Sequence, residues 1–214
     1  PEEKRPDLNK LPENDMKTYK LLNSGYTAGL FQLEGKAVSS VMKEVDPQTI
    51  SDLTAIVALG RPGPMSTGMT NKFIANKREF LTTGQIDTDN KDISKALEET
   101  FDTVIYQEQV MALCQIVWGM SLGEADMIRR AIGRKDKKLM DELVEKLSER
   151  ENIIGLTKGE IVVLLHNFEE WSSYLFNKSH AAAYAYTAYQ TAYLKAHFPL
   201  EFYVSLLNSN IDQE

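Results

Sequence analysis

Apolar residues recur every three or four positions along most of this chain, which is the spacing of one face of an α-helix. Between Lys36 and Asp46 they fall on one stripe, and Asp46-Pro47 ends the run. Asp15 is placed as an N-cap and Gly25 as a terminator around an earlier run. The pattern predicts helices over 16–24, 36–45, 48–59, 71–80, 94–99, 107–120, 125–132, 136–150, 159–170, 181–197 and 201–208. Residues 29–35 predict a strand-like turn and 103–106 form a brief β-branched run, so we predict a mainly α, irregular multi-helix domain with little β.

Breaks in this pattern suggest how the chain is organised. Residues 1–16 are charged and rich in proline, and they predict a lead-in before a domain over 17–210. The stretch GRPGPMSTGM at 60–69 predicts a stiff, extended segment, because proline and glycine disfavour helix and central strand. Residues 81–95 are polar and turn-like, so a sub-division is expected near 80–100. Gly133 is expected to end the helix that the capping box Ser121–Glu124 begins.

Composition then narrows the class of protein. The chain has 214 residues, 43 % hydrophobic and 26 % charged, which is enough to bury one sizeable core or two small ones. No apolar run reaches the roughly 18 residues that a membrane span needs. The single cysteine, Cys114, rules out an internal disulfide framework and lies on an apolar helix face, so we expect it in the core. The sequence begins with Pro1 instead of Met and has no apolar signal segment, so we expect a piece of a longer protein or a processed one, and the single unpaired cysteine suggests a cytoplasmic setting.

The charge distribution points to one region. The net charge is −7, which is not typical of a nucleic-acid-binding protein, yet the run RRAIGRKDKK at 129–138 carries six basic residues and one acid. It is either a solvated surface or a phosphate site. Arg129 and Arg130 lie about 100° apart on a helix, so at most one points inward freely. Without a ligand the cluster repels itself, and we expect an acidic neighbour such as Glu124 or Asp126 to offset it.

A second basic break occurs in FNKSHAAAY. Asn177 and Ser179 are good N-caps, and Lys178 and His180 lie beside the free N–H groups and positive dipole end of the next helix. These features indicate either an anion site or a simple cap. The two basic breaks together suggest a polyphosphate held between two helical segments. The tyrosines at 186, 189 and 193 follow at helical spacing and indicate core packing or a stacking platform for bases.

Several motifs are absent from the sequence. It has neither a Walker P-loop nor a G-x-G-x-x-G motif, and no paired aspartates occur in a metal-binding context. The catalytic metal ligands of a phosphoryl or nucleotidyl transferase are therefore not found, and no metal site is predicted here.

Six segments in order carry a family resemblance: AGLFQLEG, DLTAIVALGRPGPM, the following GM, VIYQEQVM, EADMIRRAIGRK and FNKSHAAAYAYTAYQTAYLKAHFPLEF. They resemble the fingers region of the bacterial C-family replicative DNA polymerases, the DNA polymerase III alpha subunits. The resemblance covers about residues 17–208. It implies PHP and palm domains upstream and a clamp-binding region downstream, with the catalytic aspartates and their Mg²⁺ in the palm. No catalytic residue is then expected in this chain.

The resemblance also implies what the basic segments do. The residues that would bind the triphosphate and sugar of an incoming dNTP, or lie beside them, are Arg129, Arg130, Lys178, His180, Asn177, Ser179 and Tyr174. The resemblance implies that Arg61 would support the nucleotide or nucleic acid, and Gln107, Arg134 and Lys135 are candidates for the same role from their residue types and positions. Primer–template DNA and other replisome subunits would be partners of the whole polymerase. The alternative is a non-catalytic helical module that binds a partner protein or single-stranded nucleic acid.

Overall fold

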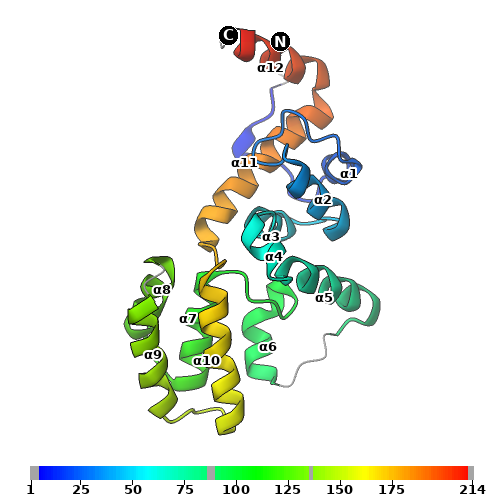
Figure 1. Ribbon diagram of the computed structural model, residues 1–214. Coiled ribbons are helices and arrows are strands. Elements are labelled where there is room, and N and C mark those ends of the chain that lie inside the picture. Colours follow the sequence, from blue (N-terminus) through cyan, green and yellow to red (C-terminus); the bar gives the residue numbers. More distant parts are fainter. Residues whose placement is uncertain (1–4, 86–89, 135–136, 212–214) are drawn as a thin grey trace. The chain divides into compact units, whose positions relative to one another are not determined.

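The computed structural model describes residues 5–85, 90–134 and 137–211, and these residues form a mainly α fold (Figure 1). No strand occurs within these ranges, and none of the helices there combines the length and apolar character of a membrane span. Two 3₁₀ turns lie at Leu8–Lys10 and Glu98–Thr100. The α-helices are α1 (Met16–Ser24), α2 (Lys36–Val45), α3 (Ile50–Leu59), α4 (Pro62–Ser66), α5 (Met69–Thr83), α6 (Lys91–Leu97), α7 (Gln107–Trp118), α8 (Leu122–Arg134), α9 (Lys137–Glu149), α10 (Lys158–Ser172), α11 (Lys178–His197) and α12 (Pro199–Ile211).

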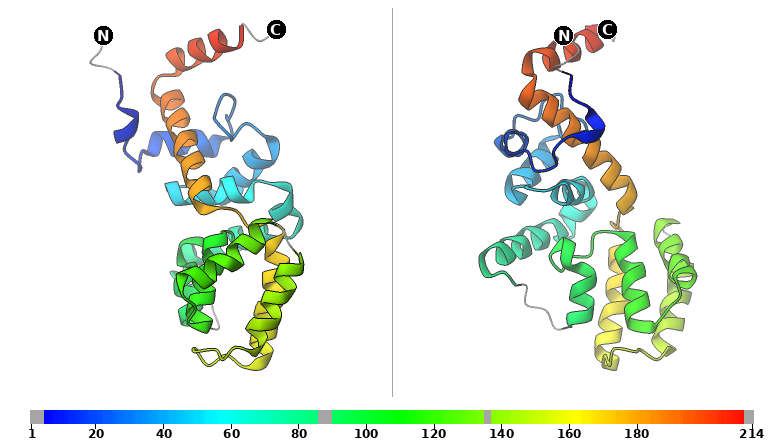
Figure 2. Two further views of the ribbon diagram at one scale, coloured as in Figure 1. Left: turned by 90° about the vertical axis from the view of Figure 1, so that its left-hand side faces the viewer. Right: turned by 180° about the vertical axis from the view of Figure 1, so that it is seen from behind.

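Contacts divide the chain into two compact units, Pro1–Arg61 with Ser179–Glu214, and Pro62–Lys178. In the first unit, both views of Figure 2 show α11 running past α1 and α2. The buried stripe of α11 consists largely of alanine. Tyr189 lies on that stripe without solvent exposure, and its ring centroid is 5.6 Å from that of Tyr19. Tyr189 is therefore a core residue.

The second unit has a continuous apolar core. Its α7 packs against α6 and α8, while α9 contacts both α8 and α10. Cys114 is completely buried in this core, as its apolar helix face predicts, and burial raises the pKa of its thiol to about 12. A neutral, buried thiol packs as a small apolar side chain and is not a nucleophile. The other core residues from α7, α8 and α10 include Val110, Leu113, Val117, Trp118, Ala125, Ile128, Leu165 and Phe168.

Local capping chemistry sets several helix ends where the sequence predicts them. Asp15 accepts a hydrogen bond from the backbone N–H of Thr18 at 2.8 Å, and α1 ends before Gly25, whose φ is +79°. Ser121 and Glu124 form the expected capping box at the start of α8. These predictions are confirmed because they depend only on neighbouring residues.

Three local predictions are wrong. Residues 62–66 form the short helix α4, because both prolines lie in its first turn, where a missing N–H breaks no helical hydrogen bond. Gly133 lies inside α8, which continues to Arg134. Residues 103–106 contribute a single bridge residue, Tyr106, instead of a strand. At 29–35, where a strand-like turn was expected, the chain forms turns. The domain expected over 17–210, with its sub-division near 80–100, stays a prediction.

Candidate functional site

Two of the motif segments lie against each other in the second unit. The backbone N–H of Gln107 donates to the carbonyl of Phe176 at 2.9 Å, and the N–H of Phe176 donates to the carbonyl of Ile105 at 3.1 Å. These bonds form an isolated parallel bridge between Tyr106 and Phe176. The start of α7 is thereby fixed beside residues 174–178, which are about 70 positions away in the sequence.

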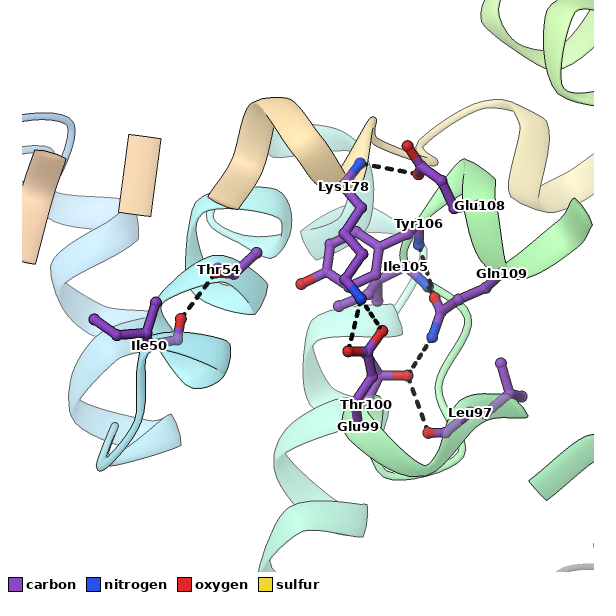
Figure 3. A network of polar contacts seen from close by, with 10 residues as sticks. All are labelled: Ile50, Thr54, Leu97, Glu99, Thr100, Ile105, Tyr106, Glu108, Gln109 and Lys178. Atoms are coloured by element: carbon purple, nitrogen blue, oxygen red, sulfur yellow. Dashed lines mark hydrogen bonds and ion pairs between the residues drawn. The ribbon is translucent and has the colours of Figure 1, made fainter. Parts of the chain in front are cut away.

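Glu108 occupies the point where α11 begins. Its carboxylate accepts from the side-chain amide of Asn177 at 2.9 Å. It also accepts from the backbone N–H of Lys178 at 2.9 Å, a bond shown in Figure 3. An anion belongs at such a helix start, since its first N–H groups have no helical partner. An anion site and a simple cap were both expected at this helix start, and the structure shows that a carboxylate of the protein itself lies there.

Lys178 also has a carboxylate at its side-chain end. Figure 3 shows its ammonium group pointing to Glu99, whose oxygens lie 2.7 and 2.8 Å from Nζ. The ammonium lies 5.9 Å from the centroid of the Tyr106 ring, within cation–π range. The pair is about 40 % exposed on both sides, so water and salt screen it and its contribution to stability is small. The Lys178 ammonium is thus positioned by Glu99, and its exposure leaves it accessible to another anion.

Gln109 has a structural role at the start of α7. Its side chain is buried, and its carbonyl oxygen accepts from the N–H groups of Ile105 and Tyr106 at 2.8 and 2.9 Å. Its amide nitrogen donates to the hydroxyl of Thr100 at 2.5 Å. Gln109 therefore fixes the residues that form the bridge to Phe176. Glu99, Glu108 and Thr100 lay outside the predicted site, because no local pattern marks a contact between distant segments.

The basic cluster on α8 has the acidic neighbour that was expected. Asp126 accepts from Nε of Arg129 through one oxygen and from Nε of Arg130 through the other, each at 2.7 Å. The hydrogen bond from Arg129, followed by that from Arg130, lowers the pKa of Asp126 despite an opposing effect of burial. Arg130 is the more exposed of the two arginine side chains, at 63 % against 30 %. Glu124, the other acid considered, pairs instead with Arg150.

Two glycines bring further segments to the same region of the second unit. A Cβ atom added at Gly133 would lie 3.6 Å from the side-chain amide of Gln107. A Cβ added at Gly63, in α4, would lie 3.5 Å from Cβ of Tyr174. The end of α8, the start of α7, α4 and residues 174–178 are therefore linked through these contacts. Tyr174 is buried, which raises the pKa of its hydroxyl far above the ordinary value and keeps it neutral.

Each of the remaining predicted residues belongs to one of the two units or lies outside the described residues. Arg134 is exposed at the end of α8, and Lys135 lies outside the described residues. In the first unit, Arg61 donates from Nε to the carbonyl of Ala58 at 2.8 Å, and burial lowers the pKa of its guanidinium. Ser179 and His180 are exposed, and the His180 ring lies 4.1 Å from that of Tyr184. Within the described ranges, no three His, Cys, Asp or Glu side chains form a group that could hold a metal ion.

Comparison with known proteins places these segments in a family. Residues 1–152 match the family described as the bacterial DNA polymerase III alpha subunit finger domain. The chain is 38 % identical over 205 residues to the DNA polymerase III subunit alpha of Aquifex aeolicus, covering 95 % of this chain and 17 % of that protein. The Campylobacter jejuni subunit is 40 % identical over 203 residues, covering 94 % of this chain and 17 % of that protein.

The Escherichia coli K12 subunit is 36 % identical over 208 residues, which cover 96 % of this chain and 18 % of that protein. The chain therefore spans less than a fifth of the length of these relatives. Since the family match covers most of the chain, the resemblance drawn from the sequence motifs is confirmed. The chain belongs to the family of bacterial DNA polymerase III alpha subunit finger domains.

Proposed function

We propose that this chain is the part of a DNA-directed DNA polymerase that binds the triphosphate of an incoming dNTP. The guanidinium groups of Arg129 and Arg130 and the ammonium of Lys178 supply the positive charge. Asn177 and Tyr174 lie beside Lys178 in the chain. The roles of Ser179, His180, Arg61, Gln107, Arg134 and Lys135 in contacting nucleotide or nucleic acid stay predictions from the resemblance.

The observation that carries this proposal is the linkage of the two basic segments through the start of α7. Gln107 bonds through its backbone to Phe176, next to the Lys178 segment, and its side chain lies against Gly133, which follows Arg129 and Arg130 on α8. Cations that are far apart in sequence are thus carried by segments that touch one common residue. Arginine suits phosphate because its fork of N–H donors matches two oxygens, and lysine adds a compact charge.

The chemistry supported by this arrangement is charge stabilisation and alignment. As a dNTP is added to a primer, negative charge develops on the departing pyrophosphate, and fixed cations stabilise it. We propose that Mg²⁺ is held elsewhere in the polymerase, because the described residues here offer no group of ligands that fits it. Primer–template DNA and other replisome subunits are the proposed partners of the whole enzyme, with the cytoplasm as its location.

The test is Arg130→Ala in the polymerase that carries this chain, assayed by steady-state nucleotide incorporation. Removal of a charged hydrogen bond costs about 1.5–3 kcal/mol, so kcat/KM for dNTP should fall roughly 10- to 150-fold. The dissociation constant for primer–template should change little. Lys146→Ala removes an exposed cation from α9 in the same unit and is the matched control. An unchanged kcat/KM for dNTP in Arg130→Ala would overturn the proposal.

A further inference from the structure

The arginine pair on α8 poses a geometric problem. Consecutive helical residues diverge by about 100° around the axis, so the side chains of Arg129 and Arg130 leave α8 in different directions. Two arginines that diverge in this way do not converge on one small anion unless something draws them together. In this structure Asp126 draws the two arginines together, because its carboxylate accepts a hydrogen bond from each of them.

Asp126 stands at the position that can reach both arginines. It precedes Arg129 by three residues and Arg130 by four, and these are the two spacings at which helical side chains are neighbours. Each of its oxygens accepts one Nε–H, at 2.7 Å in both cases. Because both bonds end on the same carboxylate, the two guanidinium groups are held next to each other.

The atoms used in these bonds matter for function. A guanidinium has five N–H donors, and Asp126 takes only the one on Nε, at the side of each group. In the part of the chain that the structure describes, the terminal nitrogens of Arg129 and Arg130 have no recorded ion pair or hydrogen bond. The end-on forks, which bind two phosphate oxygens at once, are thus left for a ligand. The carboxylate also offsets the repulsion between the two cations, because it attracts both of them.

We propose that Asp126 is a positioning residue that sets Arg129 and Arg130 side by side, so that their two forks bind adjacent phosphate groups of one polyphosphate chain. The inference rests on the proposed function, since it assigns to the same site the requirement for at least two linked phosphates. A single phosphate engages one fork, whereas a di- or triphosphate engages both.

The charge and shape of Asp126 can be separated by substitution. Asp126→Asn keeps the shape, but its NH₂ group faces an arginine N–H donor, so one of the two guanidiniums is released. Asp126→Glu keeps both acceptors on a chain one methylene longer. Asp141→Asn is the matched control, because Asp141 is an exposed aspartate on the next helix, α9, with no recorded ion pair in the described ranges.

The experiment measures KM for dNTP, kcat and primer–template affinity in the polymerase that carries this chain. Asp126→Asn should raise KM for dNTP about tenfold, the lower end of the effect of losing one charged hydrogen bond. Asp126→Glu should restore most of the affinity, and Asp141→Asn should match the parent enzyme. Primer–template affinity and thermal stability should stay close to the parent values in all three variants.

A double-mutant cycle separates positioning from any other role. In an Arg129→Ala/Arg130→Ala background, Asp126→Asn should have no further effect on KM, because its action passes through the arginines. If the effect persists in that background, or if Asp126→Asn leaves KM unchanged while the single arginine variants raise it, the positioning role is wrong and the proposed function stands. If the arginine variants themselves leave KM unchanged, the proposed function falls, and the inference falls with it.

Discussion

A buried lysine illustrates how single residues shape this molecule. Lys195 lies on the alanine-rich stripe of α11 and is only 5 % exposed. Its ammonium donates to the backbone carbonyls of Tyr26 and Ala28, at 2.7 and 2.5 Å, and lies 5.3 Å from the centroid of the Tyr203 ring. A buried charge is tolerated only when it is well partnered, and here it ties the turn after α1 to α11.

Replacement of this lysine should be costly. Lys195→Met keeps the length of the side chain but leaves two carbonyls without their donor, so the free energy of unfolding should fall by about 2–3 kcal/mol. Urea denaturation of the chain, followed by circular dichroism, measures this change. Lys20→Met, at an exposed position of α1, is the control and should stay within about 0.5 kcal/mol of the parent. If Lys195→Met also stays within about 0.5 kcal/mol of the parent chain in its free energy of unfolding, the ammonium has no structural role.

At the scale of helices, the capping box of α8 connects a local motif to tertiary structure. Glu124 accepts from the backbone N–H and the hydroxyl of Ser121, both at 2.8 Å, and from Arg150 at 3.0 Å. The Ser121 hydrogen bonds, with a smaller contribution from Arg150, lower the pKa of Glu124 to about 2. The box starts α8, and the ion pair links that start to the residue after α9.

This lowered pKa predicts a pH dependence with a definite sign. A carboxyl whose pKa is lower in the folded state contributes stability above its unfolded pKa and loses it as the pH falls through the folded value. Glu124→Gln should therefore melt below the parent chain at pH 7, and the difference should shrink between pH 4.5 and pH 2. Thermal melting across this range measures it, with Glu142→Gln, at an exposed position of α9, as the control. A difference that grows on acidification would contradict the assignment.

The sequence predicted helices well wherever their ends depend on neighbouring residues, as at Asp15, Gly25 and Ser121. It failed where a residue's usual preference is overridden by its position. Pro62 and Pro64 fit the first turn of α4, and Gly133 continues α8 beside Gln107. The basic segments were found from their charge, and Asp126 was one of two acidic neighbours expected for them, whereas Glu99 and Glu108 became specific partners only in three dimensions. A carboxylate on a helix surface has many possible neighbours, and the fold selects among them.

For the whole molecule, the bridge between Tyr106 and Phe176 is the feature that local patterns could not predict. Each segment is too short and irregular to identify its partner, and the pairing spans about 70 residues. The two basic segments suggested one shared phosphate site from their charge, but not this bridge. The structure contributes a physical link, through Gln107, between the segment that carries Lys178 and the helix that carries Arg129 and Arg130.

We propose that this chain binds the nucleotide while the catalytic metal ions are held elsewhere in the polymerase, and this leads to a prediction about the chain on its own. Nucleotidyl transfer requires metal ions that stabilise both the attacking and the leaving oxygen. The described residues include the cations that we propose for phosphate but no group of three metal-binding side chains, and the chain spans less than a fifth of the length of its relatives. The 214-residue chain alone should therefore fold but should not extend a primer in the presence of Mg²⁺ and all four dNTPs. Primer extension on a denaturing gel, beside the whole polymerase and a mock preparation, measures this. Template-dependent extension above the mock would mean that this chain carries its own catalytic centre, and the proposal that it only binds and aligns the nucleotide would have to be abandoned.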